Sequence, residues 1–155
     1  MTDVMTVTGP VPPGALGITL THEHLFMDLV GGGPSRDRQT RNRMLNDPEL
    51  AYRELMRFRA AGGTTIVDLT SGGMKVSEHL LGAQHPLAVR DLALRTGLNI
   101  VLGTGWYTEE YYDERLYRMT ADDIADELVR DVTEGIEGTD VRAGVLGEIG
   151  SGATW

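Results

Sequence analysis

The chain of 155 residues contains no cysteine, and its basic residues are outnumbered by acidic ones. Without cysteine there is neither a disulfide framework nor a thiolate metal site, so a bound metal has to use imidazole and carboxylate ligands. The 14 basic and 23 acidic residues give a net charge of −9, which repels nucleic-acid phosphates and anionic membrane surfaces. We therefore expect neither nucleic acid nor a membrane as a partner.

The sequence also lacks the apolar stretches of membrane and targeting segments. No apolar run approaches the roughly 18 residues that a membrane span requires, and Met1 to Gly9 carry neither the basic region nor the long apolar region of a signal peptide. These absences predict a cytoplasmic protein. Apolar residues make up 41% and charged residues 24% of the chain, which is the composition of a globular domain, and the length suffices for one domain.

Strand-like and helix-like segments alternate along the chain. Val4 to Thr8 and Ala15 to Thr21 alternate like strands on either side of Gly-Pro and Pro-Pro-Gly turn signals, which predicts a hairpin over residues 1–17 running into the next strand. Further strands are predicted by β-branched and apolar runs; they cover residues 64–69, 99–103 and 143–149.

Three helices are predicted between these strands. The first has Asp47 as its cap and Pro48 at its first position, and it stops at Gly62-Gly63. The second runs from Pro86 to Thr96. The third starts at Thr120, which forms a capping-box-like pair with Asp123, and carries an apolar stripe at positions 124, 128, 132 and 136.

The repeated β-loop-α order predicts a parallel sheet with right-handed crossovers. Open doubly wound sheets and closed (βα)8 barrels both begin in this way, and both place function at the carboxyl ends of the strands. Several polar side chains fall near such ends; they are His22, His24, Asp68, Thr104 and Glu148.

Two histidines flank a glutamate in the run Thr21-His22-Glu23-His24. In an extended strand His22 and His24 share one face and Glu23 takes the other. Two imidazoles spaced in this way can converge on one divalent ion. The alternative is a pair of partly buried, hydrogen-bonded histidines without a metal.

Several of these motifs, taken in order, resemble the phosphotriesterase family of the amidohydrolase superfamily. The resemblance rests on Gly9-Pro10, on the run from Leu16 to His24, on Thr65-Ile66-Val67-Asp68, on Gly103-Thr104-Gly105 and on the segment from Gly135 to Val145. The ending Glu148-Ile149-Gly150 is similar to the phosphotriesterase-homology branch of that family. The likeness covers nearly the whole chain.

The resemblance implies a (βα)8 TIM-barrel fold with two divalent metals at the carboxyl face of the barrel. Residues 1–155 then form the N-terminal part of one barrel domain, with the hairpin in residues 1–17 and the first four strands with their helices in residues 18–155. His22 and His24 are expected to bind the more buried metal. Glu148 is expected to supply the carboxylate that bridges both metals, because Gly147 stands where the best-known branch has a carboxylated lysine.

The expected role of Glu148 depends on the register of its strand. A shift of one residue sends a side chain to the opposite face. An inward Glu148 would turn Leu146 inward as well, and it would direct Val145 and Ile149 toward the helices.

Two interpretations are possible for each of three further residues, Asp68, Trp106 and Tyr107. Asp68 is expected either to accept a hydrogen bond from a ligand histidine or to cap the following loop. Trp106 and Tyr107 stand where the family has aromatic residues in its substrate pocket, and the alternative is loop packing. His79 and His85 lie beside helix starts and match no family ligand, so we expect a surface or capping role for both.

The expected activity is metal-dependent hydrolysis of an ester-type bond, that is a phosphoester, lactone or carboxyl ester, in a small molecule. Zinc is the expected metal, with two ions in the complete site of relatives. Later strands of relatives supply two further histidines and an aspartate that have no counterpart here, so this chain is expected to carry part of a site and to hydrolyse little alone. A missing C-terminal half or a homo-oligomer would complete the barrel.

Two alternatives come from other classes of protein. One is a non-catalytic half-barrel that serves only to pair with itself or with a second subunit. The other is a different hydrolase with an HxH strand, such as a TatD-like nuclease or a dihydroorotase-like amidohydrolase. The net charge weighs against a nuclease, and neither family combines the Thr-His-Glu-His run with a later Glu-Ile-Gly strand.

Overall fold

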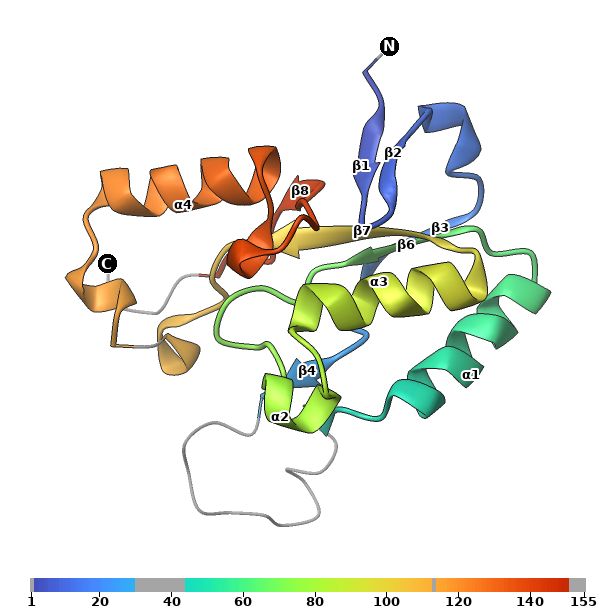
Figure 1. Ribbon diagram of the computed structural model, residues 1–155, viewed down its shortest axis with the longest axis horizontal. Helices are drawn as coiled ribbons and strands as arrows, with labels where there is room; N and C mark the ends of the chain where they lie inside the picture. The colour runs from blue at the N-terminus through green and yellow to red at the C-terminus, as the bar shows by residue number, and fades with distance from the viewer. Residues whose placement is uncertain (1, 30–43, 113, 151–155) are drawn as a thin grey trace.

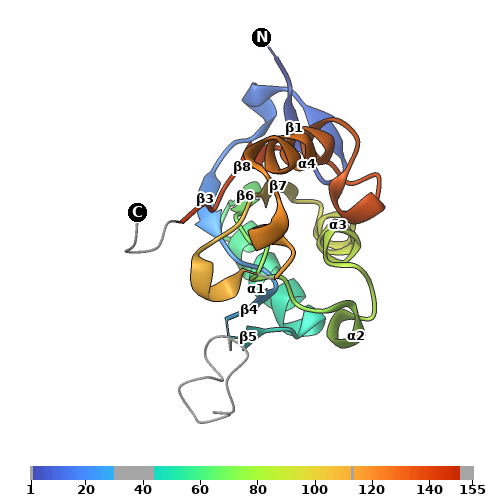
Figure 2. The same ribbon diagram turned by 90° about the vertical axis from the view of Figure 1, so that its left-hand side faces the viewer.

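A parallel sheet of four strands forms the centre of the computed structural model, which describes residues 2–29, 44–112 and 114–150. The strand order is β3-β6-β7-β8, with the bounds Thr19–Glu23, Thr65–Asp68, Asn99–Thr104 and Val145–Leu146. Figure 1 shows helices α1 (Pro48–Ala60) and α3 (His85–Thr96) along one side of this sheet. Seen end-on in Figure 2, the strands curl into an arc. The repeat predicted the parallel sheet, and its curl into a half-barrel agrees with the (βα)8 fold that the family resemblance implied.

The two inner strands are covered on the helix side by α3. Ile66 of β6 and Ile100 and Leu102 of β7 are buried and belong to one apolar core with Val89 and Leu92 of α3. Parallel strands covered in this way read as nearly continuous apolar runs, which is why both were predictable from the sequence. The register pairs Thr65 with Asn99 and continues residue by residue.

The helices begin where their capping residues predict. The side chain of Asp47 accepts hydrogen bonds from the backbone N–H groups of Glu49 and Leu50, each at 3.0 Å, and α1 follows from Pro48. Helix α4 (Ala121–Thr133) begins with a complete capping box between Thr120 and Asp123. It ends earlier than its apolar stripe indicated.

The N-terminal hairpin has a different second strand from the one predicted. Strand β1 (Val4–Thr6) pairs with β2 (Gly9–Val11) in antiparallel register, rather than with the segment 15–21. The turn lies at residues 7–8; the Thr6 hydroxyl donates a 2.6 Å hydrogen bond to the Gly9 carbonyl across it. Pro10 is tolerated in this strand because an edge strand needs no N–H from it.

Short elements connect the main ones. They are the 3-10 turns η1 (Pro13–Ala15), η3 (Glu109–Tyr111), η4 (Leu116–Arg118) and η5 (Ile136–Gly138), helix α2 (Glu78–Leu81), and the strand pair β4 (Met27–Asp28) and β5 (Met44–Leu45). None of the helices in the described ranges combines the length and the apolar character that crossing a membrane requires.

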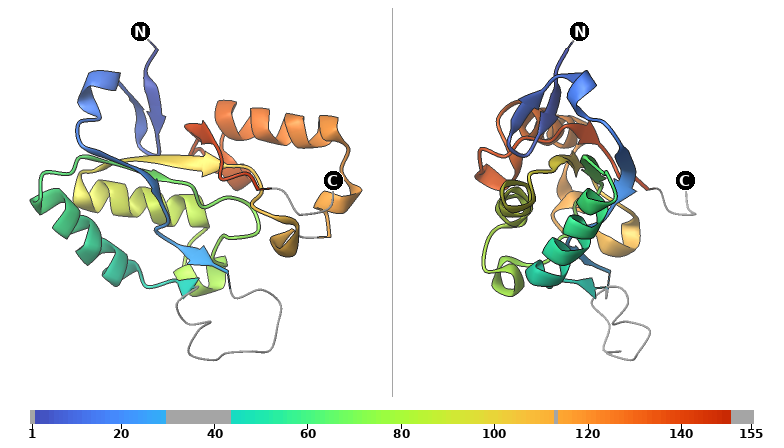
Figure 3. Two further views of the ribbon diagram at one scale, coloured as in Figure 1. Left: turned by 180° about the vertical axis from the view of Figure 1, so that it is seen from behind. Right: turned by 90° about the vertical axis from the view of Figure 1, so that its right-hand side faces the viewer.

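Strands β3 and β8 form the two edges of the sheet. Seen from behind, β3 crosses the front of the molecule without a helix over it (Figure 3, left). Because the four strands run parallel, their carboxyl ends lie together at one end of the arc, where strand-end side chains from both edges can meet.

Candidate metal centre

Three side chains that could hold a metal ion come together at the carboxyl ends of the edge strands. The Nε2 atoms of His22 and His24 lie 3.4 and 3.5 Å from the same oxygen, Oε2 of Glu148. One ligand atom from each residue lies within 4.8 Å of the other two, and the two imidazole rings stand edge to face with centroids 5.4 Å apart. The curl of the sheet therefore brings residues from opposite edges into one cluster.

An irregularity in β3 aims the two histidines at Glu148. Leu20 is paired with Ile66, but Glu23 is paired with Asp68, so three steps along β3 match two steps along β6. Such a bulge changes the direction of side chains in a strand and is frequent beside active sites. Leu20, Glu23 and His24 all line a groove of about 310 Å³ beside α1, and the imidazoles of His22 and His24 face Glu148.

The loop after β6 holds the backbone of Glu148. Its N–H donates to the Leu69 carbonyl at 3.2 Å, and its carbonyl accepts a 2.7 Å hydrogen bond from the Ser71 hydroxyl. The chain turns out of β8 at Gly147, whose φ of 143° is a conformation that residues with side chains rarely adopt. Glu148 thus reaches the cluster from a loop.

This placement differs from the extended strand expected over residues 143–149. Strand β8 contains only Val145 and Leu146, so the period-two argument does not extend to Glu148. Ile149 was expected to face the helices, but it is 61% exposed. The positive φ of Gly147 ends the strand and explains the difference.

A hydrogen-bonded chain stands behind His24. Its Nδ1 lies 3.1 Å from the hydroxyl oxygen of Thr70, and that hydroxyl lies 2.7 Å from Oδ1 of Asp68. Both Thr70 and Asp68 are fully buried. Asp68 is therefore one hydroxyl group away from the histidine, and the direct contact that was one of its two expected roles is absent. The other expected role, a cap for the following loop, is present as a 2.9 Å hydrogen bond from the Thr70 backbone N–H to Oδ1. Sequence reasoning missed Thr70; its signal was a hydroxyl two residues after a strand-end aspartate.

The donor set fits a divalent transition metal. Imidazole and carboxylate suit zinc, manganese and cobalt, and catalytic zinc sites hold three protein ligands, such as two histidines and a glutamate, with one position open. Two ligands at about 2.0–2.1 Å from a tetrahedral zinc lie about 3.3–3.4 Å apart, close to the two nitrogen–oxygen distances here. The His22 side chain is 54% exposed, so a molecule in solution can approach the cluster.

The two aromatic residues expected in a substrate pocket, Trp106 and Tyr107, make their contacts outside the cluster of His22, His24 and Glu148. Trp106 lines a second cavity of about 530 Å³; the described residues around it include Lys75 and Arg130, but none of the three cluster residues. Tyr107 stacks on Tyr111 at a centroid distance of 5.7 Å. A substrate-binding role for these residues stays a prediction.

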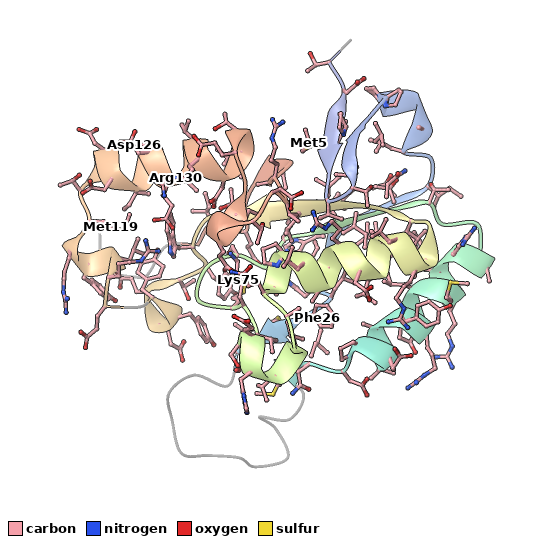
Figure 4. All side chains as sticks on the ribbon, viewed as in Figure 1. Met5, Phe26, Lys75, Met119, Asp126 and Arg130 are labelled. Carbon is pink, nitrogen blue, oxygen red and sulfur yellow. The ribbon has the colours of Figure 1, made fainter. Side chains whose placement is uncertain are left out.

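One of the two remaining histidines, His85, is buried, although the sequence indicated a surface position. His79 is exposed, as expected for a surface residue. His85 opens α3, but only 2% of it is exposed, so the expected surface or capping role is wrong for it. Its Nε2 donates to the Phe26 carbonyl at 3.2 Å, and Phe26 lies beside the first turn of α3 (Figure 4). Burial lowers the pKa of this imidazole.

Known proteins resemble this chain in sequence and in fold. The phosphotriesterase family model matches residues 2–154. The N-acetyltaurine hydrolase of Tetraodon nigroviridis is 34% identical, with 96% of this chain and 47% of that protein covered. The chain thus spans about half the length of the curated relatives it matches.

Two crystal structures extend the likeness to the fold. A resiniferatoxin-binding protein from Rhodobacter sphaeroides has a TM-score of 0.82 at 34% identity and covers 96% of this chain and 46% of that one. The phosphotriesterase homology protein from Escherichia coli has a TM-score of 0.71 at 25% identity, with 91% and 44% covered. By sequence and by fold, the chain belongs to the phosphotriesterase family and forms the N-terminal half of its barrel.

Proposed function

We propose that this chain provides the first part of the active site of a zinc-dependent hydrolase that cleaves an ester-type bond in a small molecule. The observation that carries the proposal is the convergence of His22, His24 and Glu148 on one point. Membership of the phosphotriesterase family supports hydrolysis as the reaction class. A carboxyl ester, lactone or phosphoester is the proposed substrate, and the similarity to N-acetyltaurine hydrolase adds an N-acyl bond to the candidates.

Each residue of the cluster has a proposed part. The three residues would hold a divalent ion, which would supply Lewis acidity to a bound water and to the oxygen of the bond to be cleaved. His22 and His24 bind the ion through Nε2, the atom that faces Glu148 in both residues. Glu148 is the proposed catalytic carboxylate, because it alone among the described acids faces both histidines. Asp68 supports His24 from behind through Thr70.

We propose that the cluster is completed by other polypeptide. The chain spans about half the length of its relatives. Among the described residues, its one cluster of three candidate ligands contains two histidines, His22 and His24, so a second metal would need histidines from elsewhere. The edges of the sheet expose apolar side chains, with Leu20 38% and Leu146 55% exposed. A C-terminal half-barrel or another copy of the chain would cover both edges. The 155 residues alone are expected to turn over substrate slowly.

A zinc-loaded preparation tests the proposal. Hydrolysis of an aryl ester, a lactone, an aryl phosphotriester and N-acetyltaurine is measured with and without zinc, and bound zinc is counted after dialysis. We expect bound zinc and slow, zinc-dependent cleavage of at least one substrate, both lost in His24→Ala. His79→Ala is the matched control, because it removes an exposed histidine outside the cluster. Zinc-independent cleavage, or zinc retained by His24→Ala, would overturn the assignment.

The exposed edges also favour a second candidate, a half-barrel that only pairs. Bare strand edges present unpaired N–H and C=O groups to any other chain, and here they coincide with exposed Leu20 and Leu146. Gel filtration with light scattering separates the two candidates. A stable dimer that binds no zinc and cleaves none of the four substrates would favour the pairing module; zinc bound at His22 and His24 would exclude it.

A further inference from the structure

We infer that Thr70 is a positioning residue, which fixes the proton of His24 on Nδ1 and connects this imidazole to the buried carboxylate of Asp68. The inference rests on the proposed function, because it concerns how His24 presents Nε2 to a metal. The carrying observation is the unbroken sequence of contacts from His24 Nδ1 to Thr70 Oγ1 at 3.1 Å and from Thr70 Oγ1 to Asp68 Oδ1 at 2.7 Å.

Counting donors gives these contacts a direction. A threonine hydroxyl has one hydrogen to donate, and an ionised carboxylate only accepts. The Thr70 hydrogen therefore goes to Asp68, and the Thr70 oxygen is left to accept a hydrogen from His24. In neutral imidazole only one nitrogen carries hydrogen. Nδ1–H on His24 leaves the lone pair on Nε2, the atom that lies 3.5 Å from Glu148.

The burial of Asp68 indicates a role beyond capping the loop. A carboxylate that merely caps a loop needs the bond from the Thr70 backbone N–H to Oδ1, at 2.9 Å. Asp68 is instead fully buried, and its second oxygen has no hydrogen-bond partner among the described residues. Burying an ionised group is unfavourable unless an opposite charge compensates it. A cation held by His24 would provide that compensation through the Thr70 hydroxyl.

The other end of this polar region is His85. It is buried at the start of α3, and its Nδ1 also lacks a hydrogen-bond partner within the described residues. Nε2 donates to Phe26, so Nδ1 is the acceptor of the neutral ring. His85 and Asp68 interact electrostatically. Within the described residues, the hydrogen bonds to the Asp68 side chain all come from Thr70, through its backbone N–H and its hydroxyl.

Three variants separate the positioning role from a loop cap. Thr70→Val removes the hydroxyl and keeps the shape of the side chain. Thr70→Ser retains the hydroxyl and should rescue both readouts. Asp68→Asn keeps an oxygen for the Thr70 N–H and removes the charge. Thr104→Val is the matched control, because Thr104 is also a buried strand-end threonine whose hydroxyl donates to a carboxylate, but that carboxylate belongs to Asp131 on α4.

The first readout requires no metal. In 15N-labelled protein without zinc at alkaline pH, long-range 1H–15N spectra report which ring nitrogen is protonated. We expect Nδ1–H on His24 in the wild type, Thr70→Ser and Thr104→Val, and a shift toward Nε2–H in Thr70→Val. An unchanged His24 tautomer in a folded Thr70→Val protein would overturn the inference.

The second readout is zinc affinity. Loss of a partner behind a ligand histidine typically weakens metal binding by about 10–100-fold, and we expect a loss in this range for Thr70→Val and Asp68→Asn. Wild-type affinity in Asp68→Asn would reduce Asp68 to a loop cap and overturn its part. A wild-type chain that binds no zinc but shows the expected tautomer shift would refute the proposed function and leave the tautomer assignment intact.

Discussion

Strands β6 and β7 lie at the centre of the sheet and β3 and β8 at its edges, and the two pairs differ in what surrounds their side chains. Leu102 on β7 is fully buried in the apolar core, whereas Leu146 on the neighbouring strand β8 is 55% exposed. The candidate metal ligands belong to the edges: His22 and His24 lie on or just beyond β3, and Glu148 follows β8.

This contrast separates stability from chemistry within one sheet. The centre is held by burial of apolar area, which stabilises by roughly 25 cal/mol per Å². The edges hold the candidate metal ligands His22, His24 and Glu148, which the proposed function requires to be accessible to a metal and a substrate. Loops link the two regions, since Glu148 is bonded through its backbone to Leu69 and Ser71 after β6.

Leucine truncation compares the two regions directly. Leu102→Ala should lower the free energy of unfolding by about 2–5 kcal/mol, because it leaves a cavity in a packed core. Leu146→Ala should change it by no more than about 0.5 kcal/mol, as is usual for a surface substitution. Urea unfolding followed by circular dichroism measures both. Equal losses in the two variants would show that the edge is packed in solution.

Zinc bound by the edge residues should raise the free energy of unfolding of the chain. A ligand that binds only the folded state at about 100 times its Kd adds about 2.7 kcal/mol to the free energy of unfolding. We expect this increase in the wild type and in Leu146→Ala, but not in His22→Ala. Urea unfolding with and without zinc measures it. A similar increase in His22→Ala would place the zinc outside the cluster.

His85 should make the stability of the centre depend on pH. Burial holds the pKa of its imidazole below the usual 6.5 in the folded chain, so below that pH the unfolded chain binds a proton that the folded chain excludes. Stability attributable to His85 is therefore present above pH 6.5 and falls as the pH falls toward the folded pKa. His85→Gln, which keeps a donor for the Phe26 carbonyl, should reduce this dependence. Unfolding at about one pH unit on either side of 6.5 tests it; an unchanged slope would contradict the buried neutral state.

Helix α1 flanks the edge strand β3, and its cap should contribute a smaller amount. Asp47→Ala removes the acceptor of two backbone N–H groups and should lower the free energy of unfolding by about 1 kcal/mol. Asp126→Ala is the control, because Asp126 lies within α4 (Figure 4) and caps no helix end. Thermal unfolding compares the two; an equal loss in both variants would show that net charge rather than capping is responsible.

Features encoded over a few residues were predictable from the sequence. The Asp47 cap and the Thr120–Asp123 capping box use hydrogen bonds within one turn. The inner strands β6 and β7 are recognisable in the sequence as apolar runs. The hairpin partner was wrong because Gly9-Pro10 reads as a turn, although Pro10 lies in an edge strand opposite Met5.

Features that depend on distant contacts were not predictable. His85 looks like a helix-start residue in the sequence, and its burial follows from packing against Phe26, 59 residues earlier. The role inferred for Thr70 depends on its contact with His24, 46 residues away. The proximity of Glu148 to the two histidines was expected from the family resemblance alone. It depends on the bulge in β3 and on the turn at Gly147, two features of backbone geometry that the sequence pattern does not predict.

An anomalous-difference map from a crystal grown with zinc, recorded at the zinc absorption edge, would locate the bound ion. We expect one strong peak in contact with Nε2 of His22, Nε2 of His24 and the carboxylate of Glu148. A map without a peak at these atoms, or with zinc bound only at residues such as His79, would contradict the proposed metal site.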